Sequence, residues 1–67
     1  MNNPTYIIQG MSMKSPIVYV NFDESDHSSF VYSKTQATKF ISKSLALGWM
    51  TQIQMENRSY QFSLVTL

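Results

Sequence analysis

Hydrophobic residues recur along the chain with two different spacings, and these spacings predict its secondary structure. Short runs rich in β-branched and aromatic residues predict strands over residues 5–9, 17–22 and 30–32. Gly10 and Pro16 bracket the connection between the first two strands, and the polar run 23–29 separates the second from the third. The first half of the chain is therefore expected to form β-structure.

The clearest helical signal begins at Ser33. Ser33 and Gln36 have the spacing of a capping box, in which the hydroxyl and the side-chain amide satisfy the first free N–H groups of a helix. Gly48 is the residue type that most often ends a helix. The residues between them that fall on one stripe at helical spacing are Ala37, Phe40, Ile41, Ser44 and Leu45. The pattern predicts a helix over residues 34–47.

Two further strands are expected after this helix, over residues 49–56 and 59–66, joined by a tight hairpin at Asn57 and Arg58. The order β-β-β-α-β-β predicts an α+β two-layer sandwich, with one antiparallel sheet and a single helix on one face. A chain of 67 residues has room for one thin core, so we expect a single domain over residues 1–67. The expected core residues are Val18, Val20, Phe22, Phe40, Ile41, Leu45, Trp49, Ile53, Met55, Tyr60, Phe62 and Leu64.

The sheet face opposite the helix is nearly uncharged. It is expected to carry Ile17, Tyr19, Asn21, Met50, Gln52, Gln54, Gln61, Ser63 and Val65. Protein interfaces are depleted of Lys, Glu and Asp and enriched in Tyr and Met. We therefore predict a partner-binding surface that includes Tyr19, Gln52, Gln54 and Gln61. An ordinary exposed face and the seam of a homodimer are the alternatives.

The predicted helix carries a second candidate surface. Lys34, Lys39 and Lys43 lie on its outward side without an acidic neighbour, and Arg58 extends this basic patch if it lies nearby. An acidic protein surface or a phosphate backbone would bind there, and a solvated helix face is the alternative. The net charge is +1 and the sequence pI is about 8.1, below the value of about 9 that nucleic-acid-binding domains usually exceed.

The sequence offers little for catalysis. It has no cysteine, so disulfides and thiolate metal sites are excluded. Acidic, histidine and hydroxyl side chains coincide only in residues 23–29, and neighbours in one loop seldom converge into a relay. We predict no catalytic residue, no metal site, no cofactor and no enzymatic activity. No leader or bilayer-length apolar run is recognisable, so we expect a cytoplasmic protein without membrane contact.

In size and layout the sequence resembles small phage-encoded anti-defence proteins, including anti-CRISPR proteins. The likeness lies in a cysteine-free chain of a few strands around one helix, with residues 39–42 in that helix and Gly48-Trp49 at its exit. It implies a non-enzymatic inhibitor that occupies the surface of a larger host protein or ribonucleoprotein complex. The alternative is a small nucleic-acid-binding module that uses the lysines with Phe30 and Tyr32, whose strand resembles the base-stacking strand of RNA-recognition modules.

Overall fold

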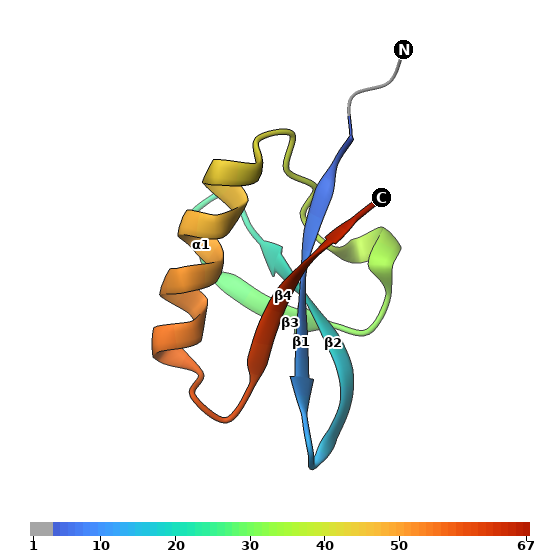
Figure 1. Cartoon of the computed structure of the whole chain (residues 1–67), viewed down its shortest axis with the longest axis vertical. Coiled ribbons are helices and arrows are strands. Elements are labelled where there is room, and N and C mark those ends of the chain that lie inside the picture. The colour runs from blue at the N-terminus through green and yellow to red at the C-terminus, as the bar shows by residue number, and fades with distance from the viewer. Residues whose placement is uncertain (1–3) are drawn as a thin grey trace.

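The computed structural model describes residues 4–67 and shows an α+β fold. Its elements are the strands β1 (Tyr6–Ser12), β2 (Ser15–Phe22), β3 (Ser28–Val31) and β4 (Gln61–Thr66), the 3₁₀ turn η1 (Lys34–Gln36) and the helix α1 (Lys43–Glu56). One antiparallel sheet packs against one α-helix, so the predicted fold class is confirmed (Figure 1).

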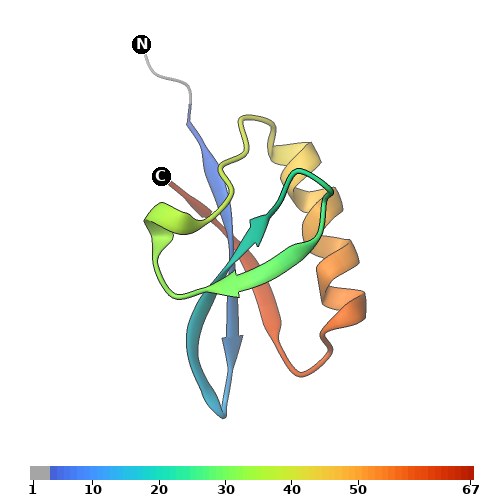
Figure 2. The same cartoon turned by 180° about the vertical axis from the view of Figure 1, so that it is seen from behind.

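The strand order in the sheet is β3-β2-β1-β4. β1 lies inside the sheet and pairs with the whole length of β4, from Tyr6 opposite Thr66 to Met11 opposite Gln61. Figure 1 looks onto the β4 side of the sheet, with α1 on one face and η1 on the other, and Figure 2 shows the same arrangement from behind. Both η1 and α1 follow β3 in the chain, and each lies on a different face of the sheet.

The main core cluster lies between the sheet and α1, whereas Ile7 is fully buried on the other face of the sheet. Ile8 and Val20 of the sheet are fully buried in this cluster, together with Ala46 and Ile53 of α1. The cross-strand pairs place Val18, Val20, Phe62 and Leu64 on the face that α1 covers, and this alternation was correctly predicted from the sequence. The aromatic and aliphatic side chains packed around this core are Tyr6, Phe22, Phe30, Trp49, Met50, Phe62 and Leu64.

The single helix is confirmed, but its predicted bounds, 34–47, are wrong, because only residues 43–47 of that range belong to α1. Residues 34–36 form a single 3₁₀ turn, capped by the Ser33 hydroxyl, which accepts from the Thr35 N–H at 3.3 Å. The α-helix starts only at Lys43, where Ser42 caps it by accepting from the Leu45 N–H at 3.2 Å. Gly48, the predicted stop, lies inside α1.

The predicted fourth strand and its hairpin are also wrong. Residues 49–56 belong to α1, and Asn57-Arg58 forms the turn from α1 into β4. The side chains that α1 turns toward the sheet are Ala46, Trp49, Met50 and Ile53. Met55 is 70% exposed, because two residues beyond Ile53 a helix points away from the core. Ile41 and Leu45, also expected in the core, are 74% and 56% exposed.

An extended segment, residues 37–41, crosses from η1 to α1 (Figures 1 and 2). Tyr6 of β1 and Phe40 exchange two backbone hydrogen bonds of 2.8 Å each. Thr38 binds β2 through its N–H, which donates to the Val20 carbonyl at 3.1 Å, and through its hydroxyl, which accepts from the Phe22 N–H at 2.7 Å. Phe40 is therefore a core residue, as predicted, but strand-like pairing holds it there.

Candidate functional site

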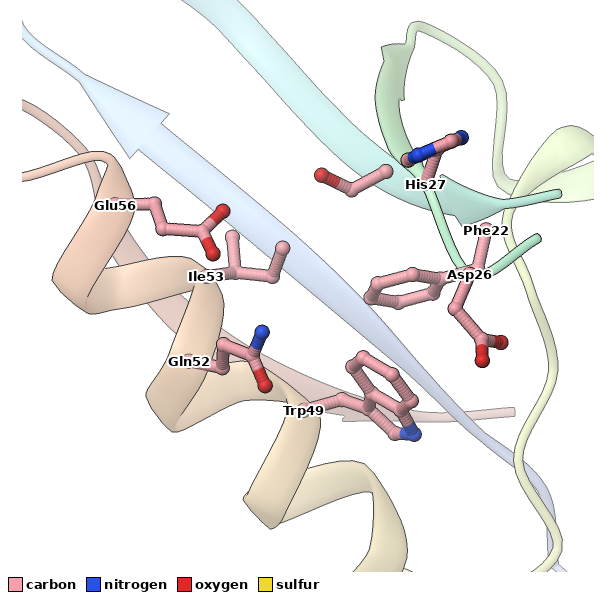
Figure 3. Close-up of a pocket in the computed structure, with 8 residues that line it drawn as sticks. Phe22, Asp26, His27, Trp49, Gln52, Ile53 and Glu56 are labelled. Carbon is pink, nitrogen blue, oxygen red and sulfur yellow. The ribbon is translucent and has the colours of Figure 1, made fainter.

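A pocket of about 320 Å³ opens between α1 and the loop that joins β2 to β3 (Figure 3). One side comes from α1, where residues 49, 52, 53 and 56 share one helix face by their three- and four-residue spacing. The other side comes from the end of β2 and the loop after it. The eight lining residues are Phe22, Asp26, His27, Ser28, Trp49, Gln52, Ile53 and Glu56.

Aromatic rings form the apolar wall of this pocket. The centroids of the Phe22 and Trp49 rings lie 4.9 Å apart, with an angle of 47° between the ring planes. Phe22 is held in turn by an edge contact with Phe40, at 6.0 Å between centroids. Ile53 beside them is 2% exposed. The wall is thus built on core residues, which gives it a fixed shape.

Polar side chains line the rest of the pocket: Asp26 and Glu56 carry carboxylates, Ser28 and Gln52 are uncharged, and His27 carries an imidazole. Asp26 comes from the loop, whereas Glu56 and Gln52 project from α1 (Figure 3). Glu56 is the last residue of the helix, where the helix dipole adds a partial negative charge. No Lys or Arg is among the lining residues. The electrostatic potential of the pocket therefore favours a cation.

The Asp23 carboxylate organises the loop that carries Asp26 and His27. Its Oδ1 accepts from the backbone N–H groups of Ser25 and His27, each at 2.9 Å. The hydrogen bond from the His27 N–H is the main reason that the pKa of Asp23 is lowered; desolvation opposes it, and Ser25 and the His27 ring add to the lowering. Asp26 has a φ of 62°, a left-handed conformation that Asp adopts more readily than most residues.

The same loop is the segment in which acidic, histidine and hydroxyl side chains coincide in the sequence, and it contains a contact between an acid and the histidine. His27 Nδ1 lies 3.7 Å from Asp23 Oδ2, and both side chains are exposed. Within residues 4–67 no hydroxyl group hydrogen-bonds to the imidazole of His27, and no group of three His, Cys, Asp or Glu side chains is placed to hold a metal ion. Within residues 4–67, the described geometry of this loop is thus a surface contact between the Asp23 and His27 side chains.

The residues predicted to form a partner-binding sheet face separate into two groups. Tyr19 and Gln61 lie on the face away from α1, as expected, because Tyr19 is opposite Gln9 and Gln61 is opposite Met11. Gln52 and Gln54 belong to α1, so their predicted position on the sheet is wrong. Gln52 lines the pocket, and the Gln54 side chain hydrogen-bonds to the start of β4.

The predicted lysine face on one helix is wrong. Lys34 lies in η1, Lys39 in the crossing segment and Lys43 at the start of α1. The Lys39 ammonium donates to the Thr35 carbonyl at 3.3 Å. Arg58 follows the other end of α1, and a helix of 14 residues is about 21 Å long. Arg58 therefore does not extend a patch that begins at Lys43.

The two aromatic residues predicted to stack on bases differ in their surroundings. The Phe30 ring packs against Tyr60 and Phe62, with centroid distances of 4.9 and 6.1 Å. Phe30 therefore belongs to the packing under α1, whereas Tyr32 is 72% exposed.

No protein-family model matches this chain, and comparisons with curated proteins and with solved structures give no significant match either. Among residues 4–67, no helix has both the length and the apolar character needed to cross a bilayer.

Proposed function

We propose that this chain is a non-enzymatic protein-binding module that blocks a larger protein or ribonucleoprotein complex by occupying part of its surface. The observation that carries the proposal is the outer sheet face, which is the face away from α1. Its residues are Ile7, which is fully buried, and Gln9, Met11, Ile17, Tyr19, Asn21, Ser29, Val31, Gln61, Ser63 and Val65, and none of them is charged. Surfaces of this composition suit a protein interface.

The exposure of two apolar side chains supports the same proposal. Met11 and Ile17 are 49% and 45% exposed on the outer sheet face. At the opposite end of that face, the Asn21 side chain donates to the Gln36 carbonyl of η1 at 2.8 Å, which holds η1 beside it. The open part of the face is therefore the end near the β1–β2 turn, where a partner would bury Met11 and Ile17.

The outer sheet face ends at the free edge of β4, and no element crosses in front of this edge in Figure 1. The Leu67 N–H donates to the Thr5 carbonyl at 2.8 Å, so by alternation the backbone groups of Leu64 and Thr66 point away from β1. β4 contains no charged residue or proline, the features that commonly protect edge strands. An extended segment of a partner can add to such an edge.

A phage anti-defence inhibitor, such as an anti-CRISPR protein, is the kind of binding module that the chain resembles in size and layout. Expression of the chain in a CRISPR-immune bacterium should then raise the plaquing efficiency of the targeted phage. If the plaquing efficiency stays unchanged with every type of CRISPR effector, the chain is not an anti-CRISPR inhibitor. The broader proposal of a protein-binding module would then remain.

The nucleic-acid alternative has less support, because its cations lie on separate elements and Phe30 is packed in the interior. Binding through phosphate contacts weakens steeply with salt. Retention of the chain on an oligonucleotide column at low salt, lost at moderate salt, would favour the alternative over the proposal.

The proposal is tested by affinity purification from a lysate of the host cell. We expect the wild-type chain to retain a partner that the Met11→Lys and Ile17→Lys variants lose. Met55→Lys is the matched control, because Met55 is 70% exposed on α1 and lies outside the outer sheet face. Recovery of the chain alone, with a dimeric mass in solution, would instead make the outer sheet face the seam of a homodimer.

A further inference from the structure

We propose that the pocket between α1 and the β2–β3 loop binds a guanidinium group, the side chain of an arginine that a partner protein presents. The partner as the source of this arginine rests on the proposed function. The affinity of the pocket for arginine is independent of the proposed function, because it follows from the residues that line the pocket.

The aromatic wall suits a planar cation. A guanidinium group stacks on aromatic faces, and Trp is the aromatic residue that attracts cations most strongly. Phe22 and Trp49 both line the pocket, 4.9 Å apart between ring centroids, and both are only half-buried. Neither ring is therefore fully covered by the chain itself.

The polar wall supplies the acceptors that a guanidinium needs. Arginine presents five N–H donors in a fixed fork and pairs with carboxylates in a bidentate way. The Glu56 carboxylate projects from α1 into the pocket, the Gln52 amide lies between Trp49 and Glu56 on the helix, and Asp26 lines the opposite, loop side (Figure 3). Glu56 and Gln52 can thus accept from the guanidinium on the helix side, and the charge of Asp26 on the loop side adds to the attraction.

Size and charge argue against other ligands. A volume of about 320 Å³ lies at the lower end of the roughly 300–1,000 Å³ of small-molecule sites, so it suits one side chain better than a larger ligand. An anion would meet two carboxylates and no Lys or Arg. A purely apolar ligand would remove water from the same carboxylates without pairing them, which is unfavourable.

The experiment uses Trp49, the one tryptophan of the chain, as a fluorescent reporter inside the pocket. The chain is titrated with N-acetyl-arginine amide, N-acetyl-lysine amide and the uncharged isostere N-acetyl-citrulline amide. We expect a saturable change in Trp49 emission with arginine, at least about threefold weaker binding of lysine because it lacks the planar fork, and no response to citrulline. No saturable response to arginine, or an equal response to citrulline, would overturn the proposal.

Variants locate the binding. Glu56→Gln should weaken arginine binding by at least about fivefold, since it removes a charge-assisted hydrogen bond, and Asp26→Asn should weaken it by a smaller factor, since it removes a negative charge that lines the pocket. Glu24→Gln is the matched control: it removes one negative charge from the same loop, but Glu24 does not line the pocket. Equal weakening by all three variants would indicate general electrostatic attraction and overturn the site.

The role of a partner is tested separately. The Asp26→Asn/Glu56→Gln double variant should also lose the partner that the wild-type chain retains from the host lysate. If that partner stays bound to the double variant, the arginine assigned to the partner is overturned, whereas the arginine site stands on the titration. If the lysate yields no partner, the proposed function fails and the titration result is unaffected.

Discussion

The side-chain amide of Gln54 binds the backbone of Phe62 as a neighbouring strand would, with Oε1 accepting from the Phe62 N–H at 3.1 Å. The Nε2 group of the same amide donates to the Tyr60 carbonyl at 2.6 Å. One residue of α1 thus satisfies two outward backbone groups at the beginning of β4. The open edge of the sheet begins only beyond them, at Leu64.

Replacement of Gln54 by Met should lower the free energy of unfolding by about 1–3 kcal/mol. Met has a similar size but no amide, so the Tyr60 carbonyl and the Phe62 N–H would lose their partner while remaining half-buried. Urea denaturation followed by circular dichroism measures the change. Gln52→Met, two residues away on an exposed position of the same helix, is the control and should stay within about 0.5 kcal/mol of the wild type. Equal losses in both variants would contradict the role of the Gln54 amide.

Gly48→Ala should raise the free energy of unfolding by about 1 kcal/mol. Gly48 lies inside α1, and a Cβ atom there would have no neighbour within 4 Å. Alanine at such a position favours the helix because glycine loses more backbone entropy when it is ordered. Thermal unfolding should show the gain as a higher midpoint temperature, and a lower midpoint would show that residue 48 is not helical.

Gly10→Ala should act in the opposite direction and lower the free energy of unfolding by about 1–3 kcal/mol. A Cβ atom on Gly10 would lie 2.8 Å from Cε1 of Phe62 and 3.1 Å from Cγ2 of Val18. The Phe62 ring would have to move out of a packed core. The same chemical change at Gly48 serves as the control in the same denaturation experiment, and a neutral Gly10→Ala variant would argue against the close packing of β1 and β4.

Loss of the Asp23 charge should destabilise the β2–β3 loop as the pH falls. The pKa of Asp23 is lowered from 3.8 in the folded chain, so the ionised carboxylate stabilises the fold above about 3.8. This contribution is lost as the pH falls through the lowered pKa. Wild type should therefore be more stable than Asp23→Asn at neutral pH, and the two should converge in acid. A stability difference that does not change with pH would show that the charge of Asp23 has no part in it.

The sheet was largely predictable because its residues alternate with a period of two, and burial of one face enforces that alternation. Val18, Val20, Phe62 and Leu64 lie on the buried face for this reason, and Ile17 and Ser63 lie on the other. Extended segments with β-branched residues show this pattern locally.

The helix was misplaced because local signals favoured the wrong segment. Ser33 does cap a turn, but Phe40 pairs with the Tyr6 backbone, and this tertiary contact outweighs the helical spacing around it. The helix that forms contains Gly48 despite its cost of about 1 kcal/mol. The sequence signal for it was the spacing of Ala46, Trp49, Met50 and Ile53, the stripe that buries apolar area against the sheet.

The pocket could not have been found in the sequence by a local pattern. Phe22 and Asp26 lie more than twenty residues from Trp49 and Glu56, and they meet only when α1 packs on the sheet. Once Trp49, Gln52 and Glu56 are read as helical, their common face is evident. The residues that lie opposite this helix face depend on how α1 packs against β2. A local sequence pattern does not specify that packing.

The position of β1 inside the sheet also governs when this domain can fold. One neighbour of β1 is β2, which follows it directly, but the other is β4, which begins at residue 61. Pairing over such a sequence separation generally places folding on a scale of about milliseconds to seconds, because a long loop must close first. During synthesis, the sheet cannot be completed until β4 has left the ribosome. Until then, the backbone edge of β1 that pairs with β4 is open to pairing with another chain.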